Sequence, residues 1–151
     1  IIPAGYADEL GPARDAINAM EYEQAIVLLN AHLERQPDDE TGRYLLARTF
    51  AWDNQFDAAA REYTRLLSRN PDNPDYLYGK AQALVWQDKN TEALPLLERA
   101  WRLANDNADI WKTYILLLRQ SKDPQLRQRG KELVAQAKVK FPHGEWDLIG
   151  N

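Results

Sequence analysis

The chain repeats its own sequence at a fixed interval, and this period restricts its possible folds more than any other feature. The stretch FAWDNQFDAAAREY begins at Phe50 and the stretch LVWQDKNTEALPLL begins at Leu84, so that Trp52 is matched by Trp86. The same step recurs at small, bulky and turn-forming positions: Ala25, Ala59 and Ala93; Leu29, Tyr63 and Leu97; Tyr44 and Tyr78; Pro37 and Pro71; Asp38, Asp72 and Asp106. A period of about 34 residues, with apolar residues at helical spacing, predicts repeats of two helices that stack on their neighbours.

Four such repeats fit within the 151 residues, and they predict a single all-α domain. We place the repeats at 6–39, 40–73, 74–107 and 108–142, with a C-terminal tail over 143–151. In the two best-matched repeats we expect helices near 40–53, 56–69, 74–87 and 90–104. Alanines that recur at fixed positions are expected where paired helices approach closely, at Ala47, Ala59, Ala81 and Ala93.

The helix boundaries have local signals. Asn73 is predicted to cap the helix that Pro74 begins, and Asp123–Pro124 has the same pattern. Gly11–Pro12 interrupts the first repeat, so its first helix is expected to begin near Pro12. The fourth repeat ends about three residues late, which predicts an insertion near 121–127.

Over nearly its whole length this pattern resembles the tetratricopeptide repeat family. The resemblance implies an α-solenoid that forms a right-handed superhelix, with a concave groove lined by the first helix of each repeat. It also implies a protein or peptide partner in that groove, contacted by Tyr44, Arg48, Trp52, Tyr78, Gln82, Trp86 and Lys112. The Lys/Asn pattern by which some members hold a C-terminal carboxylate is absent, because Tyr44 and Tyr78 stand in its place. An alternative stays open for Trp52 and Trp86, whose rings could pack on the next repeat and lock the superhelix.

No catalytic, metal-binding or cofactor-binding motif is present in the sequence. The chain has no cysteine and two histidines, of which His32 is expected to have a structural role between helices. The acidic cluster Asp38–Asp39–Glu40 is interpreted as favouring the start of the helix that follows. We therefore predict that the protein is not an enzyme and needs no metal or cofactor.

Charge is distributed unevenly along a chain of net charge −4. Residues 6–39 carry eight acids and two bases, whereas residues 108–151 carry five acids and eight bases. The acidic balance argues against nucleic acid as a partner. The asymmetry is interpreted as solvated helix faces, with end-to-end self-association as the alternative. No signal peptide is visible, no apolar run is long enough for a membrane span, and the lack of cysteine leaves the compartment open.

The two tryptophan-containing phrases are also similar to repeat arrays of bacterial envelope proteins, which precede an outer-membrane barrel in exopolysaccharide export. This narrower resemblance implies a periplasmic or outer-membrane-associated location, with the cytoplasm as the alternative. Two functions follow from it. The first is a non-enzymatic scaffold that binds a partner protein in the groove. The second is a periplasmic module that binds a polysaccharide or guides a polymer, with Tyr44, Trp52, Tyr78 and Trp86 stacking on sugar rings.

Overall fold

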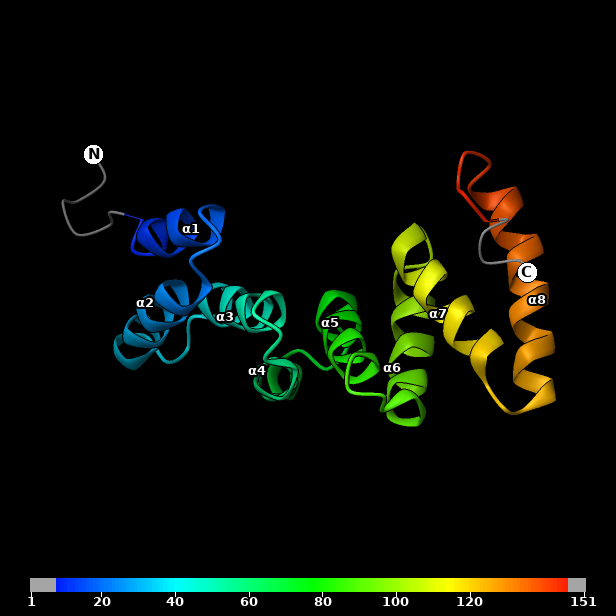
Figure 1. Cartoon of the computed structure of the whole chain (residues 1–151), viewed down its shortest axis with the longest axis horizontal. Helices are drawn as coiled ribbons and strands as arrows, with labels where there is room; N and C mark the ends of the chain where they lie inside the picture. The colour runs from blue at the N-terminus through cyan, green and yellow to red at the C-terminus, as the bar shows by residue number, and fades with distance from the viewer. Residues whose placement is uncertain (1–7, 147–151) are drawn as a thin grey trace. The chain divides into compact units, whose positions relative to one another are not determined.

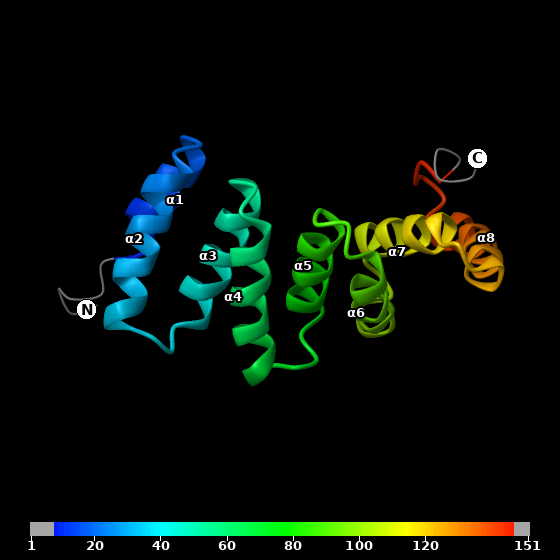
Figure 2. The same ribbon diagram turned by 60° about the horizontal axis from the view of Figure 1, so that its bottom comes forward.

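The computed structural model describes residues 8–146, and over this range the chain forms eight α-helices and no strand. In order they are α1 (Gly11–Asn18), α2 (Tyr22–Arg35), α3 (Glu40–Trp52), α4 (Phe56–Arg69), α5 (Pro74–Val85), α6 (Asn90–Leu103), α7 (Ala108–Gln120) and α8 (Pro124–Lys140). Within α1–α4, and again within α5–α8, each helix packs on the helix that follows it through a short connection (Figures 1 and 2). The predicted all-α arrangement of helix pairs is confirmed, and the expected helix bounds in the second and third repeats are met within two residues.

The chain divides into two compact parts, an N-terminal half (Ile1–Pro71) with α1–α4 and a C-terminal half (Asp72–Asn151) with α5–α8. Each half is described by itself. The recurring alanines Ala47, Ala59, Ala81 and Ala93 are fully buried, in keeping with the close helix approach predicted for them. A larger side chain at these positions would push the paired helices apart.

Polar caps start the first helix of each later repeat. The carboxylate of Asp39 accepts from the backbone N–H of Thr41 at 3.1 Å, and the side chain of Asn73 accepts from the N–H of Asp75 at 3.0 Å. Asp123 caps α8 in the same way, directly before Pro124. The caps predicted at Asn73 and Asp123 are therefore confirmed, because both signals are local in sequence.

The turns inside the repeats also follow the repeat period. Met20, Asn54 and Asp88 each have a left-handed backbone, with φ of 61°, 59° and 63°. The connection between α7 and α8 differs, because Ser121 is extended with φ −61° and ψ 145°. This connection is no longer than the others, since α6 begins at Asn90 and α8 begins one full repeat later, at Pro124. The extra residues predicted near 121–127 instead lengthen α8, which has 17 residues where α6 has 14.

Aromatic side chains close the core of the C-terminal half. Trp111 and Tyr114 are 2% and 1% exposed, and the Trp101 ring meets both, at centroid distances of 5.3 and 5.6 Å. Trp146 belongs to the segment predicted as a tail, yet its ring is buried against Phe141 and its indole Nε1 donates to the Phe141 carbonyl at 3.0 Å. The chain is thus anchored to this core as far as Trp146.

Candidate functional site: the exposed faces of α3 and α5

Three predicted groove residues come together on one face of α3. Tyr44, Arg48 and Trp52 are spaced four residues apart, so a helix places them on one side. The Arg48 guanidinium carbon lies 5.6 Å from the centre of the Tyr44 ring and 4.7 Å from the centre of the Trp52 ring. A guanidinium over aromatic faces is attracted by their electron density, and stacking limits its motion. The face is therefore an ordered ladder of ring, cation and ring.

Tyr22 extends this ladder from another helix. It is the first residue of α2, and its ring centre lies 6.4 Å from that of Trp52, with 30° between the ring planes. The sequence analysis missed Tyr22, although the aromatic Phe56, at the equivalent position of the next repeat, was a signal for a ring here. We call Tyr22, Tyr44, Arg48 and Trp52 the aromatic–arginine ladder.

Arg48 differs from most arginines around it in having no ionic partner among residues 8–146. Five of the seven arginines of the N-terminal half form ion pairs: Arg14, Arg35, Arg43, Arg65 and Arg69. Within the described part of the chain, the contacts of Arg48 are with the two rings. The Arg48 side chain is exposed, so its N–H groups are accessible from solvent.

An open surface pocket of about 720 Å³, called the cavity below, adjoins the Tyr22 end of the ladder. Met20 and Val27, which are 76% and 62% exposed, contribute apolar surface to it. Three carboxylates also line it: Glu21, Glu23 and Asp53. The cavity therefore combines apolar side chains with negative charge, whereas the ladder beside it carries a single positive charge.

The equivalent face of α5 has different chemistry. The Gln82 amide donates to the Tyr78 hydroxyl at 2.9 Å, and that hydroxyl lies 3.0 Å from the Thr113 hydroxyl of α7. Burial raises the pKa of Tyr78, while the hydrogen bond to Thr113 acts in the opposite direction. The Trp86 ring is 71% exposed. Two predicted residues are thus joined by hydrogen bonds, and the third presents a large indole surface.

Lys112 lies apart from this chain of hydrogen bonds. Its amino group lies 5.9 Å from the ring centre of Trp146, so it covers the end of the aromatic core. The sequence left open whether Trp52 and Trp86 pack on the next repeat instead of facing a partner, and the structure gives contacts and exposures for both. Trp52 packs on Tyr22 of the preceding helix pair and is 40% exposed, and Trp86 is more exposed still. The binding role of the seven predicted residues stays a prediction.

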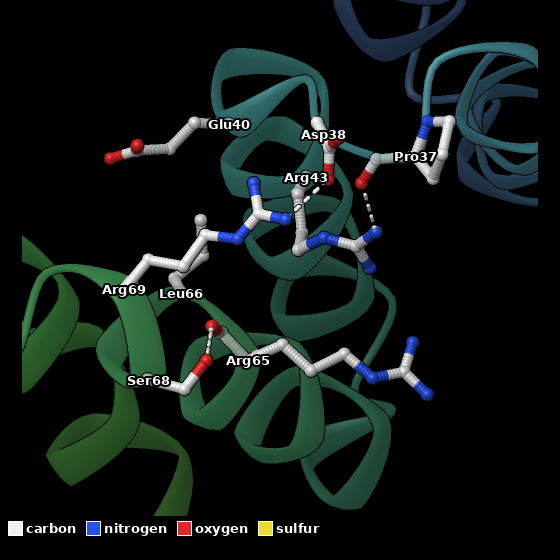
Figure 3. Close-up of a pocket in the computed structure, with 8 residues that line it drawn as sticks. All are labelled: Pro37, Asp38, Glu40, Arg43, Arg65, Leu66, Ser68 and Arg69. Carbon is white, nitrogen blue, oxygen red and sulfur yellow. Dashed lines mark hydrogen bonds and ion pairs between the residues drawn. The ribbon is translucent and has the colours of Figure 1, made fainter.

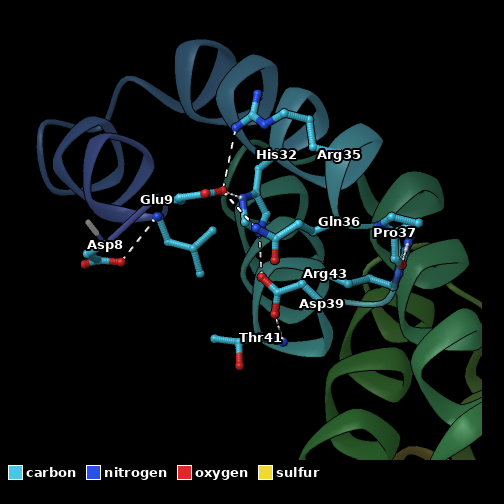
Figure 4. A network of polar contacts seen from close by, with 10 residues as sticks. Asp8, Glu9, His32, Arg35, Gln36, Pro37, Asp39, Thr41 and Arg43 are labelled. Atoms are coloured by element: carbon cyan, nitrogen blue, oxygen red, sulfur yellow. Dashed lines mark hydrogen bonds and ion pairs between the residues drawn. The ribbon is translucent and has the colours of Figure 1, made fainter. Parts of the chain in front are cut away.

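His32 sits in a buried polar network (Figure 4). The ring is 4% exposed, its Nε2 lies 2.6 Å from a carboxylate oxygen of Asp39, and its Nδ1 lies 3.1 Å from one of Glu9. Burial alone would raise the pKa of Asp39, but the hydrogen bond and charge of His32, together with backbone hydrogen bonds from Gly42 and Thr41, outweigh it, so the pKa is lowered. Both ring nitrogens are occupied within the protein, in agreement with the structural role predicted for this histidine.

A second cavity, of about 150 Å³, is lined by Arg43, Arg65 and Arg69 (Figure 3). Each of these three arginines forms an ion pair with a carboxylate of the protein. Arg69 pairs with Asp38, and Arg43 pairs with Glu62 at 2.7 Å and donates to the Pro37 carbonyl at 2.9 Å. Because these charges are already satisfied, this cavity offers a ligand less than Arg48 does. Among residues 8–146, no group of three or more His, Asp or Glu side chains is placed to hold a metal ion.

Comparison with known proteins extends these observations. The model of the tetratricopeptide repeat family matches residues 16–83 and 52–114. Cellulose synthase operon protein C of Pseudomonas fluorescens (strain SBW25) is 33% identical over 93 residues, which are 62% of this chain but 7% of that protein. The chain therefore spans a small fraction of this relative.

Solved structures share the fold at low sequence identity. YrrB, described as a TPR protein with an unusual peptide-binding site, matches with a TM-score of 0.78 and 18% identity over 94% of this chain and 72% of its own. MamA of Desulfovibrio magneticus RS-1, from residue 41 to its end, matches at 0.80 and 10%, over 91% of this chain and 76% of its own. The O-GlcNAc transferase of Thermobaculum terrenum matches at 0.74 and 19%, over 88% of this chain and 25% of its own. These likenesses show the arrangement of helices and no more.

Proposed function

The chain belongs to the tetratricopeptide repeat family, whose fold serves as a scaffold for protein interactions, and we propose that it is a non-enzymatic scaffold that binds a segment of a partner protein. The binding surfaces are the exposed faces of α3 and α5. Peptide binding is also the property named for YrrB, which shares the fold.

One observation carries the proposal: an exposed tryptophan recurs at the same position of two repeats. Trp52 and Trp86 are one repeat apart, and their side chains are 40% and 71% exposed. Leaving large aromatic surface in water is unfavourable, and tryptophan is enriched among the residues that dominate protein interfaces. A role in contacting a partner explains why indole rings stand at positions where the core does not need them.

We place this interaction in the bacterial cell envelope, in the periplasm or at the outer membrane. The support is the relative from a cellulose synthase operon, together with the tryptophan phrases of the two central repeats. No helix among residues 8–146 has the length and apolar character needed to cross a bilayer.

A capture experiment tests the proposal. The wild-type chain and a Trp52→Ala/Trp86→Ala variant are immobilised and exposed to a bacterial envelope extract, after circular dichroism has verified their helicity. Leu103→Ala/Val139→Ala is the matched control, because it removes two other exposed apolar side chains, which are 47% and 84% exposed. We expect a protein that is retained by the wild type and the control and lost from the tryptophan variant.

Two results would contradict the proposal. Equal retention by all three proteins would place the contact surface away from α3 and α5. A change in tryptophan fluorescence with cello-oligosaccharides, seen with the wild type but not the tryptophan variant, and without protein capture, would instead favour the saccharide-binding role predicted as the alternative. That role has no support from the site geometry, and the relative whose name points to it is matched over 7% of its length.

A further inference from the structure

The aromatic–arginine ladder has a property that the proposed scaffold role does not require. Stacking between Tyr44 and Trp52 orders the Arg48 guanidinium, yet among the described residues no carboxylate pairs with it. Arg65 and Arg69 are also exposed on the surface, and both still find acidic partners. Arg48 is therefore an oriented cation, without an acidic partner in residues 8–146, on the face proposed to bind a partner.

The guanidinium group suits one kind of ligand. Its planar fork of N–H donors matches the two oxygens of a carboxylate, and such bidentate pairs are among the stronger hydrogen bonds in proteins. Here the plane is already held by two rings, so less side-chain freedom is lost when a ligand binds. A carboxylate that docks on Arg48 can also place adjoining apolar groups on Trp52.

The surroundings limit how much negative charge the ligand can carry. The cavity beyond Tyr22 is lined by Glu21, Glu23 and Asp53, and residues 6–39 as a whole have a net charge of −6. A polymer with a charge on every unit would bring further negative charges against these carboxylates, and like charges repel. A chain with one acid, followed by apolar or basic groups, meets attraction at both Arg48 and the cavity.

From this charge pattern we propose that the ladder binds a peptide segment through a single Asp or Glu side chain, which pairs with Arg48, while a neighbouring apolar or basic side chain enters the cavity at Met20 and Val27. This assignment rests on the proposed scaffold function and adds the chemistry of the partner. The equivalent α5 face lacks this preference, since Gln82 is neutral and is hydrogen-bonded to Tyr78.

The test uses a phage-displayed library of random dodecapeptides as the probe. It is selected in parallel on the full 151-residue wild-type chain, on Arg48→Gln and on Arg61→Gln. Arg48→Gln introduces the residue that the equivalent position of α5 already has. Arg61 is the matched control, because it is the other exposed arginine of the N-terminal half that forms no ion pair with a described residue. Circular dichroism verifies that both variants are folded.

We expect peptides with one acid beside apolar residues to be enriched on the wild type and on Arg61→Gln, and this acid preference to disappear on Arg48→Gln. For a synthetic peptide from the selection, the dissociation constant should rise about 10- to 100-fold on Arg48→Gln. Replacing the Asp or Glu of the peptide by Asn or Gln should raise the dissociation constant for the wild type by the same factor. The two changes together should cost no more than either alone, because they remove one contact.

Other results would overturn the assignment. Peptides without an acid preference, or with the same preference on Arg48→Gln, would reject the role of Arg48 and leave the scaffold function standing. Absence of enrichment on the wild type would also reject it, and the envelope capture experiment then decides the scaffold function separately. Quenching of tryptophan fluorescence by oligogalacturonate, lost in Arg48→Gln but not in Arg61→Gln, would assign the ladder to an anionic saccharide instead.

Discussion

Two pairs of residues, one in each half of the chain, occupy the same repeat positions with opposite chemistry. In the N-terminal half Arg43 and Glu62 form an ion pair of 2.7 Å, with side chains 18% and 10% exposed. In the C-terminal half the residues one repeat later are Leu77 and Leu96, and Leu77 is 2% exposed. The helix pair forms in both cases. The repeat therefore accepts either an ion pair or two leucines at these two positions.

The exposed faces of α3 and α5 also have different chemistry at an equivalent repeat position. Tyr44 and Tyr78 are equivalent, and so are Trp52 and Trp86, but the residue between them is Arg48 on α3 and Gln82 on α5. The arginine is held by rings, whereas the glutamine is held by a hydroxyl group. One framework thus presents a charged face on α3 and a neutral face on α5.

The largest effect is expected in the aromatic core of the C-terminal half. Trp111→Ala removes a ring that is 2% exposed, together with the indole hydrogen bond to the Asn105 carbonyl at 2.7 Å. We expect a loss of about 3–5 kcal/mol in the free energy of unfolding, because the cavity left behind cannot collapse fully. Guanidinium denaturation followed by circular dichroism measures it. An unchanged midpoint would show that this ring is not part of the core.

A smaller effect on the free energy of unfolding is expected when Arg43 and Glu62 are replaced by the leucines of the other half. Its size depends on whether one or both residues are replaced. Glu62→Leu alone leaves the Arg43 charge largely buried without its partner, and should cost about 3 kcal/mol. The Arg43→Leu/Glu62→Leu variant should return to within about 1 kcal/mol of the wild type, or exceed it, because two apolar side chains remove the cost of desolvating the charges. If the double variant is less stable than Glu62→Leu, the two positions are not interchangeable between the halves.

A pH-dependent effect of about 1 kcal/mol is expected at Asp39. Asp39→Asn keeps a capping side chain, as at Asn73 and Asn107, but removes the charge that faces His32. The pKa of Asp39 is lowered in the folded protein, so its carboxylate stabilises the fold at pH values above its ordinary unfolded pKa. This contribution is lost as pH falls through the lower folded value. The wild type should therefore exceed Asp39→Asn in unfolding free energy near pH 6, and the difference should vanish in strong acid.

The control for this prediction lies in the C-terminal half. Asn107→Asp places a carboxylate at an equivalent cap, where the preceding helix has Ala100 in the position of His32. Its effect on unfolding should stay below about 0.5 kcal/mol near neutral pH, because Asn and Asp cap helices about equally well. A difference between wild type and Asp39→Asn that grows on acidification would contradict the sign derived above.

The smallest effects are expected at the exposed tryptophans. Trp86→Ala should change the unfolding free energy by less than about 0.5 kcal/mol, since its ring is 71% exposed. Trp52→Ala should cost about 1 kcal/mol, because its ring contacts Tyr22 and Arg48. Equal denaturation midpoints for the two variants would mean that the ladder contributes no stability. A loss of several kcal/mol in either would assign that tryptophan to the core.

Features that depend on neighbouring residues could be predicted from the sequence. Asn73–Pro74 and Asp123–Pro124 start helices where predicted, because a cap acts on the next two or three backbone N–H groups. Tyr44, Arg48 and Trp52 share a face because a helix brings every fourth residue to the same side. The hydrogen bond between Gln82 and Tyr78 has the same spacing and was open to prediction on the same ground.

Features that join segments distant in the sequence could not be predicted from it. The contact of Tyr22 with Trp52 links α2 to the end of α3, and the burial of Trp146 depends on the packing of its ring against Phe141. The lengthening of α8 could also be seen only in the structure, because extra residues in the sequence can lie in a turn or in a helix.

The sequence by itself determined the helices, their pairing and the recurrence of a tryptophan at one position of each central repeat, because periodicity and capping act over a few residues. The structure decided that both tryptophans are exposed. The tertiary structure alone decided which charges are satisfied. It paired Arg43 with Glu62 across two helices, enclosed His32 between two carboxylates, and left Arg48 with aromatic neighbours. The physical reason is that the partner of a charged side chain is set by proximity in space, which the order of residues does not specify.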